Sequence, residues 1–255
     1  MTRNSSFLVT LAAATLLSQP AASQTQPSDA AIAYVEGNIL SVFYHEFGHA
    51  LIDLLDLPVL GQEEDAADVL AVVLTEMLWE EDAAESAARA SAITYQLSAK
   101  ELAEAGDETA WWDTHGPDLQ RHYNVVCLFY GVDPESRAAF AEEFKLPDDR
   151  AETCEEEYTI AESSWGRFLD DVTRPEGDTG DDWMTFVTDP ADSVSILLAD
   201  EVTALNKDFV LPAKIEVSLT DCGEVNAYYD SEDRSITVCT EFVDYLWDQA
   251  EAAGL

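Results

Sequence analysis

Two histidines four residues apart, His45 and His49, with Glu46 directly after the first, are the feature that most limits how this chain can fold. Residues at this spacing lie on one face of an α-helix, one turn from each other, so both imidazoles can reach a single ion. Glu46 can contact a water on that ion without being a ligand. The chain has only four histidines, and the motif uses half of them. The motif predicts a zinc-hydrolase site on a helix.

The residues around the motif are mostly apolar and predict one helix that ends near residues 57–58. Apolar side chains dominate residues 39–44 before the motif and residues 50–55 after it. Burying such a helix places two imidazoles and a carboxylate inside the protein, which is costly unless something pairs with them. A purely structural role for the histidines is therefore the weaker interpretation, although a His-Glu-x-x-His string also arises by chance.

A third metal ligand is expected, because a catalytic zinc site usually takes three protein ligands and leaves the fourth position to water. Residues 61–71 predict the first turns of a second helix, with acidic residues where the helix dipole favours them. If Glu64 binds the metal, Asp68 lies one turn further along the same face and can orient a ligand histidine. Glu63 is the alternative ligand, but Ala67 would then occupy the supporting position. We therefore favour Glu64 and expect Glu63 to be solvated.

These residues carry a resemblance to known enzymes. His45-Glu46-Phe47-Gly48-His49 with Glu64-x-x-Ala67-Asp68 is similar to the gluzincin metallopeptidases, and the Glu-x-x-Ala-Asp form looks like that of membrane-embedded CAAX-type and heat-shock endopeptidases. The chain as a whole resembles a family of bacterial envelope proteins described as metallopeptidases. That resemblance implies a zinc-hydrolase fold but no particular substrate. Its recurring stretches are found here at residues 33–38, 57–61, 120–124, 127–131 and 226–230 and at His115.

The chain departs from ordinary zincins in one respect. Those enzymes usually build a sheet before the zinc helix, and its edge strand holds a peptide substrate by main-chain pairing. Fewer than ten residues separate the expected mature N-terminus from this helix, so we expect no sheet before it. A substrate-binding strand must then come from elsewhere in the chain. Peptidase action is accordingly a weaker expectation than metal binding.

The expected chemistry is attack of an activated water on an amide carbonyl. Glu46 acts as general base and then delivers the proton to the leaving nitrogen. The oxyanion that develops on the carbonyl needs a donor facing the metal. His115 follows a loop rich in aromatic residues and is the catalytic candidate, with Tyr228 and Tyr229 as alternatives, although each could equally be a packed or surface residue. His122 is expected on the surface.

The first 23 residues have the pattern of a secretory signal peptide. Arg3 precedes an apolar run at residues 7–17, and small residues at 21–23 form a cleavage site. The run is too short to span a bilayer, and no later stretch reaches membrane length. We therefore expect an exported protein, periplasmic or extracellular, cleaved near Ser23, with a retained anchor as the alternative. Residues 24–255 then fit a single domain.

Charge excludes several classes of partner. The chain has 52 acidic against 12 basic side chains and a formal net charge of −40 at pH 7. This argues against nucleic acid or anionic lipid as a partner. The acidic residues are spread along every segment, which is typical of a solvated surface; attraction of cationic partners or calcium is the alternative. The partner that the motif implies is a peptide or protein substrate.

The four cysteines predict two disulfide bonds, because an even count in an oxidising compartment favours pairing. Three pairings are possible. We favour Cys222 with Cys239, which flank a short hairpin, and Cys127 with Cys154, which would join two successive helices. A cysteine metal site is disfavoured because the chain lacks any Cys-x-x-Cys spacing.

The hydrophobic pattern predicts a mainly α fold of the α+β type, in which the zinc helix packs on the second ligand-bearing helix. A stripe that includes Met77 on the second helix is expected in the core. Residues 215–219 alternate as in a half-buried strand, and a turn at 230–233 predicts a small antiparallel sheet. Its hairpin strands are 226–229 and 235–238, and further helices are expected at 63–79, 83–105, 118–131, 133–145, 149–172 and 192–209 and after residue 240.

Two functions from different classes fit this sequence. The first is a zinc-dependent hydrolase, a metallopeptidase of gluzincin type. The alternative is a non-catalytic envelope protein that keeps the metal, or only the fold. The missing upstream sheet favours the second, whereas the intact Glu46 favours the first, because a pure metal binder has no need of that carboxylate. Zinc buffering is disfavoured, since the chain has no histidine-rich tract.

Overall fold

The computed structural model of the chain describes residues 27–255, and the expected signal peptide lies outside them. These residues form a mainly helical structure with one small sheet. No helix within them is long and apolar enough to cross a membrane. The helices are α1 (Asp29–Leu54), α2 (Glu63–Leu78), α3 (Glu81–Ala105), α4 (Asp118–Val132), α5 (Ala138–Glu143), α6 (Asp148–Ala151), α7 (Cys154–Val172), α8 (Ser193–Asp208) and α9 (Thr240–Ala253).

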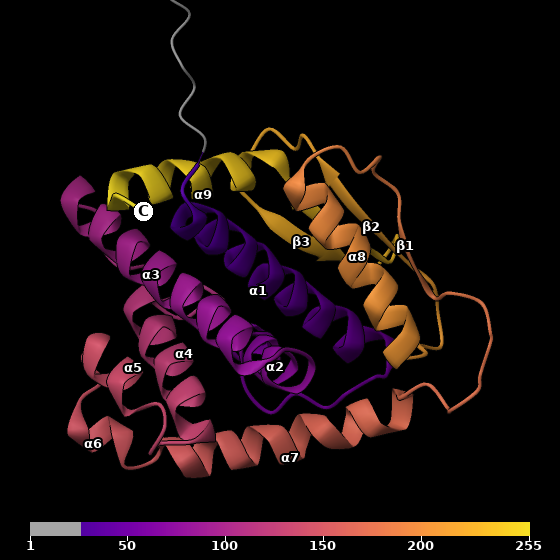
Figure 1. Ribbon diagram of the computed structural model, residues 1–255, viewed down its shortest axis with the longest axis horizontal. Coiled ribbons are helices and arrows are strands. Elements are labelled where there is room, and N and C mark those ends of the chain that lie inside the picture. The colour runs from indigo at the N-terminus through magenta and orange to yellow at the C-terminus, as the bar shows by residue number, and fades with distance from the viewer. Residues whose placement is uncertain (1–26) are drawn as a thin grey trace, which may run out of the picture.

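Helix α1 lies at the centre of the molecule (Figure 1), with α2 to α7 on one side, the sheet and α8 on the other, and α9 across one end. It begins where the Ser28 side chain accepts a hydrogen bond from the backbone N–H of Ala31, as an N-cap residue does. Its buried side chains point in every direction around the helix axis. A helix that is apolar all round is stable only when other elements surround it. The histidine motif is therefore held by the most enclosed element of the fold.

Helix α2 packs closely on α1 because Gly48 leaves room for it. A Cβ at Gly48 would lie 3.1 Å from the Cα of Ala67 and 3.3 Å from the side chain of Leu70. The backbones of the two helices thus approach at the motif itself, between His45 and His49. This approach carries the first turn of α2 to the imidazoles of α1.

The sheet has four strands in the order β1-β2-β4-β3 and differs from the one expected. The predicted hairpin is confirmed, since β3 and β4 pair antiparallel. The expectation of a purely antiparallel sheet is wrong, because β4 also pairs in parallel with β2, and β2 with β1. Strand β4 is buried on both faces, as interior strands are. The strands are β1 (Met184–Phe186), β2 (Ile215–Thr220), β3 (Ala227–Asp230) and β4 (Ser235–Cys239).

Three helix expectations need correction. Met77, expected in the core, has 47% of its surface exposed. The helix expected over 133–145 is confined to α5, because the Asp133 side chain accepts hydrogen bonds from the backbone of Glu135 and Ser136 and holds a turn there. The helix expected over 149–172 is divided into α6 and α7.

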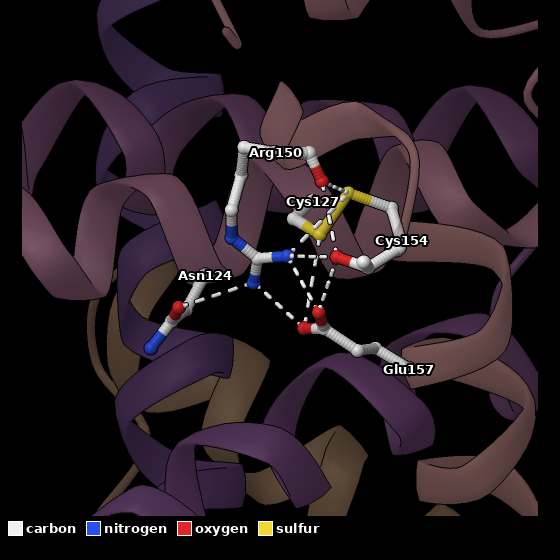
Figure 2. The surroundings of a disulfide bond; sticks show 6 residues. Asn124, Cys127, Arg150, Cys154 and Glu157 are labelled. Atoms are coloured by element: carbon white, nitrogen blue, oxygen red, sulfur yellow. Dashed lines mark hydrogen bonds and ion pairs between the residues drawn. A yellow bond between two sulfur atoms is a disulfide. The ribbon is translucent and has the colours of Figure 1, made fainter. Parts of the chain in front are cut away.

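Both favoured disulfide bonds are present, Cys127 with Cys154 and Cys222 with Cys239. The first joins α4 to the start of α7, beside the paired side chains of Arg150 and Glu157 (Figure 2). Helices α4 and α7 approach each other so closely there that a Cβ at Gly131 would lie 2.2 Å from the carbonyl oxygen of Cys154. Two disulfides are consistent with an exported protein.

Candidate metal centre

His45 and His49 lie in the wall of a cleft of about 960 Å³. Helices α1, α2, α3, α4 and α9, strand β3 and the end of the loop before α4 line this cleft. The side chain of His45 is 7% exposed and that of His49 is 14% exposed. Both side chains are therefore nearly buried where they line the cleft.

Three donor atoms converge between α1 and α2. The Nε2 atoms of His45 and His49 lie 3.2 Å apart, and Oε2 of Glu64 lies 3.1 Å from the first and 3.2 Å from the second. Ligand atoms placed about 2.0–2.1 Å from one tetrahedral ion are about 3.3 Å from one another. The three atoms are thus spaced as the ligands of a single ion would be. Of the two alternatives for the third position, Glu64 is the one that lies between the rings.

A carboxylate contacts the other nitrogen of each ring. Oδ1 of Asp68 lies 2.8 Å from Nδ1 of His45, and Oε1 of Glu63 lies 2.7 Å from Nδ1 of His49. A proton on each Nδ1 satisfies these contacts and leaves the Nε2 lone pairs directed at the common point. The expectation that Glu63 is solvated is therefore only half right: its side chain is half exposed, yet it orients His49.

Arg121 of α4 holds Asp68 in place. Its Nε donates to Oδ2 of Asp68 and its Nη2 donates to Oδ1, both at 2.7 Å. The guanidinium also lies 4.4 Å from the ring centre of Tyr95 on α3. Burial raises the pKa of Asp68, but its bonds with His45 and Arg121 outweigh burial and leave the pKa well below its usual range. Asp68 is thus a fixed negative charge beside His45.

The cluster is electrostatically suited to a cation. Hydrogen bonds from His115, and then from His45 and His49, hold the pKa of Glu64 well below its usual range. Burial lowers the pKa of His45, yet Asp68 and Glu64 together raise it to about 9. Without an ion, protons on the imidazoles must balance the carboxylates. A divalent cation can replace those protons, because the same atoms that hold them are metal donors.

Glu46 lies on the cleft wall next to the converging atoms, with only 6% of its surface exposed. Burial raises the pKa of its carboxyl, while the charges of His45 and His49 and the backbone N–H of Tyr229 oppose the rise. Glu46 therefore lines the cleft within reach of the charges of both candidate ligand histidines.

The three donor candidates take up different positions. Nε2 of His115 lies 2.9 Å from Oε2 of Glu64, so this loop residue does reach the cluster. Tyr228 lines the cleft and is 39% exposed, whereas the hydroxyl of Tyr229 donates to Asp53 at 2.8 Å. His122, expected on the surface, is buried, with its Nδ1 2.8 Å from the carbonyl oxygen of Ala92. The expectation of an exposed His122 is wrong because the face of α4 that carries His122 packs on α3.

Strand β3 is the free edge of the sheet and borders the cleft. The backbone N–H of Cys239 donates to the carbonyl of Asn226, so Asn226 belongs to a bonded pair. In an antiparallel ladder bonded and non-bonded pairs alternate, and Ala227 and Tyr229 therefore direct their backbone groups away from β4. The N–H of Ala227 donates to the side chain of Asn226 and that of Tyr229 contacts Glu46, so the two carbonyls are what this edge offers. An extended chain could pair with this edge beside Glu46.

Sequence reasoning missed the roles of two residues. Arg121 belongs to one of the recurring stretches, but nothing local in the sequence signals that it reaches a carboxylate on another helix. Glu63 could have been recognised, since it occupies the first turn of α2 next to Glu64. Its contact with His49 follows once α1 and α2 are known to pack at Gly48.

A helix with two histidines and a neighbouring glutamate, packed on a second helix that supplies a carboxylate, defines a protein that could hold a metal ion beside a proton-transferring group. The chain belongs to a protein family described as "Putative metallopeptidase", which matches residues 9–169 and 192–254. This membership supports a peptidase that uses a metal, and His45, Glu64 and His115 form a group that could bind one. No curated protein and no solved structure matches the chain significantly.

Proposed function

We propose that the protein is an exported, zinc-dependent metallopeptidase of gluzincin type, with His45, His49 and Glu64 as the metal ligands. The observation that carries this proposal is the mutual spacing of their three donor atoms, 3.1–3.2 Å, beside a nearly buried Glu46. Two imidazoles and one carboxylate are a donor set that suits zinc. The family description supports the peptidase activity.

The metal supplies two things when bound: a lowered pKa for a water molecule and polarisation of a carbonyl. The protein's own residues do the rest. Glu46 takes the proton of the attacking water and delivers it to the leaving nitrogen. Asp68 and Glu63 keep the two imidazoles in the tautomer that presents Nε2 to the metal.

The substrate in this proposal is a peptide or protein segment in extended conformation. The backbone carbonyls of Ala227 and Tyr229 would accept hydrogen bonds from it, as sheet edges do in many peptide-binding proteins, because the two N–H groups are already paired with Asn226 and Glu46. Ordinary zincins have their substrate-binding strand before the zinc helix. In this chain the strand beside the candidate site, β3, follows that helix instead. Catalysis would use His115 as the donor to the developing oxyanion, because its ring is on the metal side of the cleft.

One observation favours the alternative of a non-catalytic metal-binding envelope protein. His115 adds a further nitrogen donor beside Glu64 and His45. A site closed by four protein ligands is typical of structural zinc, whereas catalytic sites keep one position open.

Hydrolysis of a peptide mixture separates the two functions. The purified protein is incubated with unfolded peptides in the presence of zinc, with a chelator, and with zinc restored after the chelator. New peptide termini should form with zinc, cease with the chelator, and return on restoration. Glu46→Gln should keep its metal but lose at least about 100-fold in rate, since general-base catalysis contributes that much or more. Glu36→Gln on the same helix is the matched control. Unchanged turnover in the Glu46 variant rules out the assigned role.

A further inference from the structure

The loop between α3 and α4 places a third imidazole on the metal cluster. His115 follows the exposed residues of this loop, and its Nε2 lies 2.9 Å from Oε2 of Glu64. The donor atoms of His45, Glu64 and His115 all lie within 4.8 Å of one another. The rings of His45 and His115 stack with their centres 6.0 Å apart. The loop thus delivers a further nitrogen donor to the atoms that would hold the ion.

His115 is oriented in the same sense as the two histidines of α1. Its Nδ1 faces Oδ1 of Asp113 at 3.6 Å, and the same carboxylate oxygen accepts a hydrogen bond from the backbone N–H of His115 at 3.0 Å. Each of the three rings therefore has a carboxylate on its Nδ1 side and its Nε2 directed inward. In metal sites, a carboxylate beside Nδ1 is a common way to orient an imidazole that binds the ion through Nε2. A role as hydrogen-bond donor to a substrate carbonyl alone would not require His115 to contact Glu64.

We propose that His115 is a fourth protein ligand in the resting protein and that it must leave the metal before a substrate can bind. The proposal rests on the proposed function, because it assumes the ion at His45, His49 and Glu64. With an ion bound, the step would be a ligand exchange: the His115 imidazole would dissociate and an oxygen ligand would take its position, with no change of oxidation state. Released from the metal, His115 becomes the donor that catalysis requires.

The difference between the ligands explains why His115 is the one that leaves. His45, His49 and Glu64 come from two helices that pack on each other, and the side chains of the histidines are nearly buried. The side chain of His115 is 44% exposed, and Trp111 and Trp112 in the same loop are 79% and 84% exposed. A loop with so little packing moves at lower cost than a helix of the core.

Cobalt substitution tests this proposal without measuring activity. The full protein and its His115→Ala variant are loaded with one equivalent of Co²⁺, and visible spectra are recorded before and after addition of azide. The wild-type spectrum should change little with azide, because four protein ligands fill the site. The variant should bind azide readily, and free imidazole should return its spectrum to that of the wild type. Trp112→Ala, which alters the same loop without removing a donor, should behave as the wild type.

Zinc affinity provides the second measurement, by competition with a chromophoric chelator. His115→Ala should bind zinc at least about 10-fold more weakly than the wild type, the smallest loss typical of residues that support a metal site. Equal affinities and equal azide responses in the two proteins overturn the fourth-ligand proposal and leave the proposed function standing. If the wild type binds neither cobalt nor zinc, both proposals fail together.

Discussion

Arg121 donates two hydrogen bonds of 2.7 Å to Asp68, and through that carboxylate it determines the orientation of a histidine on another helix. The contact connects α4 to the ligand cluster between α1 and α2. A guanidinium presents its donors as a rigid fork that matches the two carboxylate oxygens, whereas an ammonium is a single point charge. The geometry of the pair is therefore as important as its charge.

Arg121→Lys should weaken zinc binding by about 10- to 100-fold, because a residue that supports a ligand commonly contributes that much. The substitution keeps the positive charge but cannot make both bonds to Asp68. The measurement is the zinc dissociation constant. Arg89→Lys is the control, since Arg89 pairs with Glu85 and Glu143 away from the cleft and its replacement should leave the constant unchanged. Equal constants for wild type and Arg121→Lys would show that the fork geometry is irrelevant.

Gly48→Ala should destabilise the protein although alanine favours helices. The new methyl group would meet the backbone of Ala67 at 3.1 Å, and overpacking of this kind costs about 1–3 kcal/mol. The helix-propensity gain is about 1 kcal/mol at most.

Gly166→Ala in α7 is the matched substitution, because a Cβ there meets nothing within 4 Å. It should stabilise the fold by about 0.5–1 kcal/mol. Urea unfolding measures both variants. A stabilised Gly48→Ala protein would mean that α1 and α2 do not approach as closely as described.

Glu201→Gln should raise the melting temperature at pH 7. Glu201 is buried in α8, and burial raises the pKa of its carboxyl, with the hydrogen bond from Tyr44 opposing the rise. A carboxyl with a raised pKa favours the folded state below its unfolded pKa, and this contribution is lost as pH increases through the folded value. The amide has no such loss, and its oxygen can still accept from the Tyr44 hydroxyl.

The gain in melting temperature should therefore be present at pH 7 and shrink toward pH 4. Glu216→Gln on the exposed face of β2 is the control and should show no such dependence. An equal gain in melting temperature at pH 7 and pH 4 would contradict a raised pKa for Glu201.

The local features of the site could be predicted from sequence. The spacing of His45 and His49 places both on one helix face, and the spacing of Glu64 and Asp68 does the same on the next helix. These predictions need only the helical period. The two disulfide pairs also followed from local arguments, a hairpin and two successive helices, and the structure confirms both. The catalytic roles of the residues stay predictions.

Features that depend on packing between distant segments could not be predicted. Strand β1 has three residues, too few to show an alternating pattern, and it is defined only by pairing with β2. The parallel pairing of β2 with β4 requires β3 to lie at the outer edge, on the far side of β4 from β2. The contact of His115 with Glu64 requires the path of a whole loop. Each of these features is set by tertiary contacts that leave no periodic trace in the sequence.

Zinc binding by Glu64→Ala and by Glu63→Ala distinguishes the third ligand from its neighbour. The number of ions bound per chain is measured by equilibrium dialysis at one zinc concentration. Both variants lose one carboxylate from the same helical turn, so their net charges match. At a zinc concentration well above the wild-type dissociation constant, about one ion is expected for the wild type and for Glu63→Ala, because loss of the carboxylate that orients His49 weakens binding but leaves all three ligands in place. Almost none is expected for Glu64→Ala, because only Glu64 lies between the two imidazoles. Full zinc occupancy in Glu64→Ala would contradict the assignment of Glu64 as the third ligand.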